Sequence, residues 1–175
     1  MPFQKDNILN HEKILVHLET EYNKDLEKDY YHVFNSMPID EYYNFKYGKL
    51  PYRSIKFHNV NMPIPKLLPT VTVNFTNNSK FTRITEWKNL PLHGENNCFT
   101  SLTYEEPCCY SDNNNERFYP VKDLKGLNKK NYTKYKQINN NKVTFIGRCG
   151  LYVYIDMHQA VSTALSISSN FLRNE

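Results

Sequence analysis

The chain has 175 residues, of which 39% are hydrophobic and 23% charged, and its formal net charge is +4. This length suits one domain of ordinary size, or a domain with a connecting piece, and the composition excludes a wholly disordered chain. The sequence has no N-terminal apolar leader, and no apolar run approaches the ~20 residues that span a bilayer. The cysteines and histidines show no metal-ligand spacing. We therefore expect a soluble, cytoplasmic protein without a metal site and without a membrane partner.

The densest basic stretch is 122–136, which contains six lysines and no arginine. A nucleic-acid-binding stripe typically has arginine among its lysines, with aromatic rings beside them. Tyr132 and Tyr135 lie in this stretch, but the solvated face of a helix produces the same pattern. We expect no nucleic-acid partner.

The first part of the chain contains two strand candidates. The continuous apolar run from Ile14 to Leu18 is typical of a buried strand, and residues 32–34 form a second, shorter candidate. Pro38 has no N–H donor and restricts the residue before it, so residues 37–40 are predicted to form an extended turn.

The middle of the chain has the pattern of an antiparallel sheet. Four segments alternate or are rich in β-forming residues and are joined by short turns, namely 54–60, 70–75, 81–87 and 99–104. We expect about four to six strands here. In 81–87, a period of two residues places Arg83 on one face with Phe81 and Trp87. An arginine in that setting is either a site residue or a stacked edge residue.

The last third of the chain has the pattern helix, strand, glycine-containing turn and helix. Residues 127–138 favour a helix and 143–146 a strand, which the segment Gly147 to Gly150 interrupts. Asp156 is a good N-cap for a helix from Met157, and Gln159 completes the spacing of a capping box. The free N–H groups and the dipole of such a helix start suit a phosphate or an electron-rich ring edge, although an ordinary strand-to-helix connection has the same features. The predicted fold class is α+β.

The string G-R-C-G-L-Y-V-Y-I-D-M-H-Q, from Gly147 to Gln159, resembles the flavin-contacting signature of the UDP-galactopyranose mutase family. Three further segments resemble family segments in the same order, namely 38–54 with its tyrosines, 81–88 with its arginine, and 117–121 with its tyrosine-proline pair. Together the matches cover about residues 14–165. The resemblance implies an enzyme that interconverts UDP-galactopyranose and UDP-galactofuranose. In that family the N5 atom of reduced FAD attacks the anomeric carbon of the sugar, and UDP leaves and returns.

The resemblance also implies roles for particular residues. Substrate-binding roles, chiefly toward the diphosphate, are implied for Arg83, Tyr119, Tyr154 and Tyr47, although Tyr43 competes with Tyr47 for the last assignment. Cofactor-binding roles toward FAD are implied for Arg148, Asp156, Met157, His158 and Tyr22. Arginine and tyrosine suit a diphosphate because a guanidinium donates two bonds to phosphate oxygens and a phenol adds a neutral donor.

The sequence departs from the family in one large respect. Members begin with a G-x-G-x-x-G turn that holds the FAD pyrophosphate, and the five glycines of this chain do not have that spacing. We therefore expect the C-terminal half of such a flavoprotein, whose last helix would pack on a missing Rossmann-type domain and which alone binds FAD weakly. The expected division is 1–37 as strands of the FAD domain, 38–125 as the sheet domain, and 126–175 as the return to the FAD domain.

Three hypotheses follow from this departure. In the first, a separately encoded N-terminal FAD-binding chain completes the enzyme. In the second, the chain is a catalytically inactive remnant. In the third, the sheet is reused as an interaction module.

Overall fold

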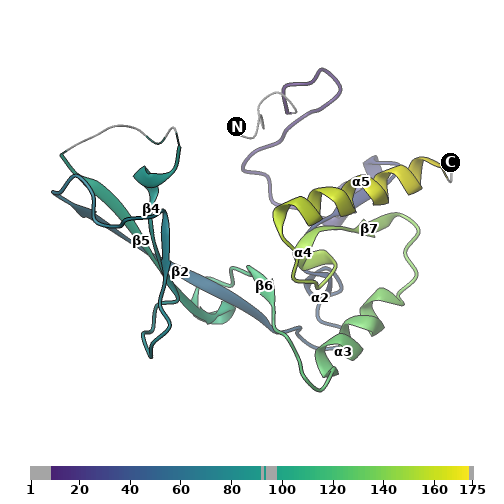
Figure 1. Ribbon diagram of the computed structural model, residues 1–175. Coiled ribbons are helices and arrows are strands. Elements are labelled where there is room, and N and C mark those ends of the chain that lie inside the picture. The colour runs from purple at the N-terminus through teal and green to yellow at the C-terminus, as the bar shows by residue number, and fades with distance from the viewer. Residues whose placement is uncertain (1–8, 92, 94–97, 174–175) are drawn as a thin grey trace. The chain divides into compact units, whose positions relative to one another are not determined.

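The computed structural model describes residues 9–91, 93 and 98–173 (Figure 1). Its contacts divide the chain into two compact units, with the division between Val33 and Phe34. Each unit is described by itself below. The predicted division into three parts, at residues 37 and 125, stays a prediction.

The described part of the first unit contains a short helix after residue 23. This 3₁₀ helix, η1 (Lys24–Asp29), begins at Asn23, whose side chain accepts a hydrogen bond of 3.0 Å from the N–H of Asp25. The strand predicted from Ile14 to Leu18 is wrong for the described structure, because 14–18 lies outside every strand and Leu15 and Leu18 are each 80% exposed. A β-strand is defined by backbone hydrogen bonds to a neighbouring strand, and the described residues place none beside this segment, whose exposed backbone water can reach.

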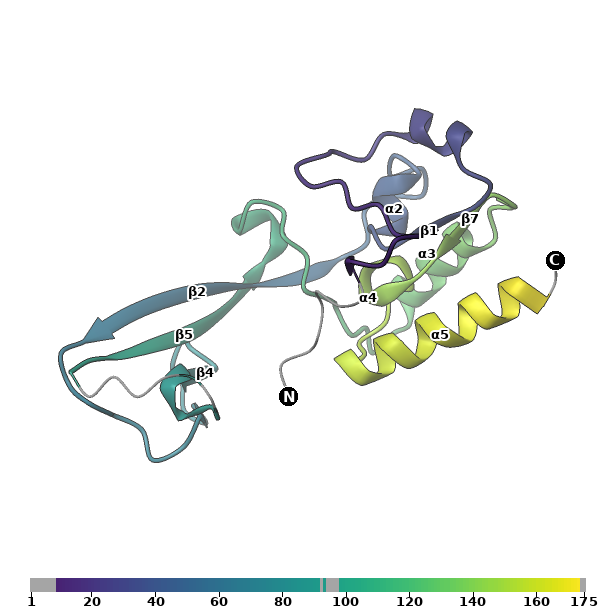
Figure 2. The same ribbon diagram turned by 90° about the horizontal axis from the view of Figure 1, so that it is seen from above.

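The second unit contains the predicted antiparallel sheet, which curls along its length (Figures 1 and 2). Its strands are β2 (Tyr52–Met62), β3 (Thr72–Asn74), β4 (Arg83–Glu86), β5 (Thr100–Cys109) and β6 (Tyr119–Pro120). They stand in the order β3-β4-β5-β2-β6, and β2 and β5 pair from Arg53 opposite Cys109 to Met62 opposite Thr100. The short 3₁₀ helices η2 (Trp87–Asn89) and η3 (Tyr110–Asp112) follow β4 and β5.

A buried carboxylate holds the outer part of this sheet together. Glu86, at the end of β4, is fully buried and accepts hydrogen bonds from the N–H groups of Leu67 and Leu68, the hydroxyl of Thr100 and the amide of Asn89. Burial raises the pKa of this carboxyl, but the four donors outweigh burial and hold its pKa below the ordinary value. Glu86 therefore connects the β2–β3 loop, η2 and β5.

The other side of the second unit is built from helices and a small sheet. Its elements are α2 (Ile39–Tyr42), α3 (Leu127–Lys136), α4 (Gly147–Gly150), α5 (Met157–Arg173) and a parallel pair formed by β1 (Val33–Asn35) and β7 (Val143–Phe145). The core here consists of Ile39, Leu50, Tyr52 and Tyr135. The turn predicted at 37–40 is shorter than expected, because α2 already begins at Ile39 and Pro38 occupies its N-cap, where no donor is needed.

Helix α5 begins where the sequence predicts. The side chain of Gln159 accepts a 2.8 Å hydrogen bond from the N–H of Asp156, which is one half of the predicted capping box. Phe171 packs edge-on against Phe34, but Met157 and Leu165 are 80% and 63% exposed. That α5 packs on a Rossmann-type domain stays a prediction.

Candidate functional site

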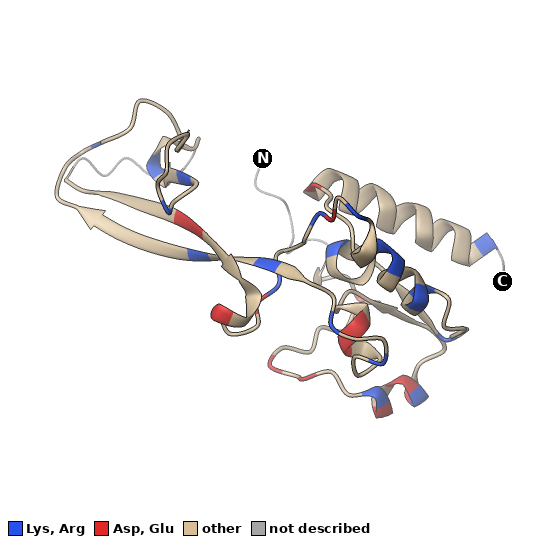
Figure 3. Ribbon diagram, turned by 90° about the horizontal axis from the view of Figure 1, so that it is seen from below, with Lys and Arg blue, Asp and Glu red and all other residues tan. Residues whose placement is uncertain are grey.

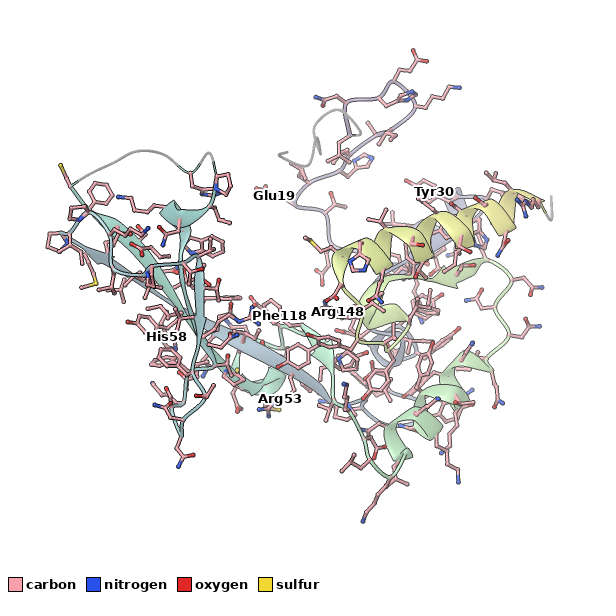
Figure 4. The ribbon with its side chains drawn as sticks, viewed as in Figure 1. Glu19, Tyr30, Arg53, His58, Phe118 and Arg148 are labelled. Carbon is pink, nitrogen blue, oxygen red and sulfur yellow. The ribbon has the colours of Figure 1, made fainter. Side chains whose placement is uncertain are left out.

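Arg148 is fixed at the turn between β7 and α5. Gly147 has a φ of +70°, which permits the sharp change of direction into α4, and a Cβ at Gly150 would lie 3.0 Å from the carbonyl oxygen of Asn35. The Nε and Nη2 atoms of Arg148 donate to the carbonyl oxygen of Ile155 at 3.1 and 2.5 Å. Its Nη1 atom donates to the carbonyl oxygen of Phe118 at 3.0 Å. Arg148 thus joins the segment before α5 to the segment before β6 (Figure 4).

Tyr154 is the centre of a group of cations and phenols. Its ring is 56% exposed, and the Cζ atom of Arg148 lies 5.2 Å from the ring centroid. Tyr119 meets the same ring edge-on, with 5.7 Å between centroids, and the Nζ atom of Lys122 lies 6.0 Å from the centroid of Tyr154. Two positive charges beside two phenols form an environment that favours an anion such as a phosphate.

An open groove of about 590 Å³ lies beside Tyr154. Tyr132 and Tyr152 line it and stack on each other, with centroids 5.7 Å apart. Burial raises the pKa of both phenols, so both stay neutral. Lys122 and Lys129 also line the groove, which therefore offers ring surfaces and positive charge together.

Arg83 lies elsewhere on the sheet. It is paired with Glu105 across β4 and β5, with 3.0 Å from Nε to Oε2, and its side chain is 49% exposed. The register places Arg83 and Tyr119 on the same face, because Arg83 is opposite Glu105 and Tyr119 is opposite Arg53 of β2. Strands β5 and β2 lie between β4 and β6. Contacts within the described residues do not join Arg83 to the group around Tyr154.

Tyr47 is also separate from that group in the contacts the structure records. Tyr47 packs against Tyr135, with 5.1 Å between ring centroids, and its N–H donates to the Tyr135 hydroxyl at 2.9 Å. Tyr22 lies in the first unit, where its hydroxyl donates to Glu27. Their predicted roles stay predictions.

The first turn of α5 presents backbone N–H groups that come before its first intrahelical hydrogen bond. The first intrahelical bond runs from the N–H of Ala160 to the carbonyl oxygen of Asp156, so the N–H groups of residues 157–159 precede it. Asp156, Met157 and His158 are exposed there. These features fit one edge of a flavin, although the N–H of Asp156 already donates to Gln159.

Arg117 follows a polar, Asn-rich segment, but in the structure it is a largely buried structural residue. Its side chain is only 11% exposed, its Nη1 atom lies 2.8 Å from the carboxylate of Glu41, and its Cζ atom lies 4.7 Å from the centroid of Tyr110 and 5.7 Å from that of Tyr52. Its charge also opposes the rise in the pKa of Asp40 that burial causes. The Asn-rich sequence before Arg117 gives no sign of this burial.

Lys122 is the residue of the site that sequence reasoning missed. The sequence pattern places it among the solvated lysines of 122–136, whereas the structure places it beside Tyr154. Its position two residues after Pro120 was the available signal, because the segment 117–121 was already assigned to the site.

These observations define an α+β protein whose sheet and C-terminal turn present an aromatic and cationic site. The chain belongs to the UDP-galactopyranose mutase family, whose model matches residues 4–154. It is 29% identical over 167 residues to a probable UDP-galactopyranose mutase of Klebsiella pneumoniae, covering 94% of this chain and 42% of the relative. It is 27% identical over 175 residues to the dTDP-fucopyranose mutase of Escherichia coli, covering 96% and 46%. The UDP-galactopyranose mutase of Mycoplasma genitalium is 30% identical over 139 residues, covering 77% and 34%.

The chain spans less than half the length of each of these relatives. In the part of the chain that the structure describes, none of the helices has the length and apolar character needed to cross a membrane.

Proposed function

We propose that this chain supplies the sugar-nucleotide side and one edge of the flavin site of a UDP-galactopyranose mutase, which interconverts UDP-galactopyranose and UDP-galactofuranose. The family match carries the proposal, because it runs through Arg83, Tyr119, Arg148 and Tyr154. The names of the relatives support a nucleoside-diphosphate sugar as the class of substrate.

In this proposal the hydroxyl groups of Tyr119 and Tyr154 bind the diphosphate of the substrate. Arg148 lies against the ring of Tyr154 and favours negative charge there, and Lys122 adds a second cation. Arg83, whose charge is partly balanced by Glu105, would bind the diphosphate from the same face of the sheet, and Tyr47 would contribute from its loop. These groups would hold the leaving UDP until it returns to the sugar.

The family implies FAD, and the chain has residues that would hold part of it. When bound, reduced FAD would supply the nucleophile for the anomeric carbon. The exposed first turn of α5, with Asp156, Met157 and His158, would hold the flavin edge, and Tyr22 would contact the adenine. The pyrophosphate contacts would come from family residues that this sequence does not contain. The exposed apolar side chains of α5 and of 14–18 are surfaces that the part carrying those residues would cover.

Titration of the chain with UDP and with uridine tests the diphosphate site. Calorimetry or NMR should show binding of UDP and much weaker binding of uridine, with binding of UDP reduced in Tyr154→Phe and Tyr119→Phe. Tyr30→Phe, which changes an exposed tyrosine of the first unit, is the control. Equal binding of UDP and uridine, or equal binding by all three variants, would contradict the assigned diphosphate site and favour the inactive remnant.

A further inference from the structure

Two exposed leucines lie at the tip that leads into α3. Leu124 is fully exposed and Leu127 is 62% exposed. Single exposed leucines are ordinary on protein surfaces. Two of them, three residues apart on one projecting turn, form an apolar tip that the described residues leave uncovered.

Lysines surround this apolar tip. Lys125 stands between the leucines, and Lys130 and Lys134 follow Leu127 at spacings of three and seven residues, which place them on its helix face. All three lysines are exposed, and Figure 3 shows the basic residues along α3. The acidic residue of this tip, Asp123, accepts from the backbone N–H groups of Lys125 and Asn128. The tip and this helix face therefore form one basic surface with an apolar end.

The opposite side of α3 is anchored to its own unit. Tyr135 is buried and donates a 2.7 Å hydrogen bond to the carbonyl oxygen of Gly48. Tyr132 stacks on Tyr152. Tyr135 is therefore closed to a nucleic-acid base, and Tyr132 already stacks on Tyr152 at the groove rather than on the face that carries the lysines. The exposed residues of α3 are Leu127, four lysines and Thr133.

Contrary to the expectation from the sequence, we propose that residues 124–134 bind the surface of a membrane that contains anionic lipids. Leu124 and Leu127 would enter the interface between headgroups and acyl chains, while Lys125, Lys130 and Lys134 would contact headgroup phosphates. Stable binding to a membrane surface combines a buried apolar anchor with a basic patch, and this surface has both. Charge complementarity alone would also fit an acidic protein, but such a partner gives no role to a fully exposed leucine at the tip.

Flotation of the purified chain with lipid vesicles tests the proposal. The chain should float with vesicles of mixed phosphatidylcholine and phosphatidylglycerol, stay behind with phosphatidylcholine alone, and be released by high salt. Removing two lysines in K130Q/K134Q should lower the partition coefficient roughly ten- to thirty-fold. L124S/L127S should also lower the partition coefficient, because it removes the apolar side chains and leaves the net charge unchanged. K13Q/K66Q, which removes two exposed lysines elsewhere, is the matched control and should bind like the unchanged chain.

Thermal unfolding should be the same for all these variants, because the replaced side chains are exposed. The proposal fails if the chain ignores anionic vesicles, or if it binds phosphatidylcholine equally well. It also fails if the partition coefficient falls equally in K130Q/K134Q and K13Q/K66Q, or if it does not fall in L124S/L127S. None of these results depends on UDP or flavin, so the proposed function is tested separately.

Discussion

The guanidinium group of Arg148 lies 5.2 Å from the ring centroid of Tyr154 while it donates to the carbonyl oxygens of Ile155 and Phe118. One side chain thus fixes a segment 30 residues before it and a segment 7 residues after it, and it orders the ring that we assign to the diphosphate. Arg148 is therefore expected to affect stability as well as binding.

Arg148→Lys should lower the free energy of unfolding by about 1.5–3 kcal/mol, the usual contribution of hydrogen bonds to a charged group. A lysine keeps the charge, but its single ammonium group cannot reproduce the fork that reaches both carbonyls. Urea denaturation followed by circular dichroism measures the change. Arg173→Lys, in the exposed last turn of α5, is the control. An unchanged midpoint for Arg148→Lys would show that these hydrogen bonds contribute nothing.

Arg117→Ala should be more destabilising than Arg83→Ala. Arg117 is largely buried, lies against two tyrosine rings and pairs with Glu41, so its removal should cost about 2–4 kcal/mol. Arg83 is half exposed, and the loss of its pair with Glu105 should cost less than about 1 kcal/mol. Thermal and urea unfolding of the two variants compare them directly. A larger loss in Arg83→Ala would contradict the burial of Arg117.

Glu86 should make the chain sensitive to acid. Because the pKa of this carboxyl is lower in the folded chain than in the unfolded one, its contribution to stability is present at neutral pH. That contribution is lost as the pH falls through the folded pKa. Glu86→Gln should be less stable at pH 7, and its stability should fall less than that of the unchanged chain between about pH 6 and pH 3. If the stability of the two proteins falls equally with pH, the assigned role of Glu86 in acid sensitivity is contradicted.

The sequence predicts the strand that carries Arg83 and the start of α5, but it does not predict β6, which carries Tyr119, or the helical turn α4, which carries Arg148. Alternation at 70–75 and 81–87 predicted β3 and β4, and the pair of Asp156 and Gln159 predicted the start of α5, because both signals are local. The strand at 14–18 was predicted from apolar residues alone. A strand also needs a partner, which the described residues do not provide.

Contacts between distant residues could not be predicted in this way. Arg117 follows a polar loop, and only the fold brings Tyr52 to its guanidinium group. Glu86 is one carboxylate among several charged residues in the sequence, and its four donors come from three separate segments. Both residues depend on tertiary packing, which local periodicity does not encode.

The most direct test is conversion of UDP-galactopyranose to UDP-galactofuranose. The chain is mixed with FAD, a reductant and the N-terminal part of the Klebsiella pneumoniae relative that this chain does not match. The mixture should form the furanose. Arg83→Ala should raise the activation free energy of this conversion by about 2.7–4 kcal/mol, whereas Lys66→Ala should leave the rate unchanged. A mixture that binds FAD but forms no furanose, or equal rates for the two variants, would contradict the proposed function.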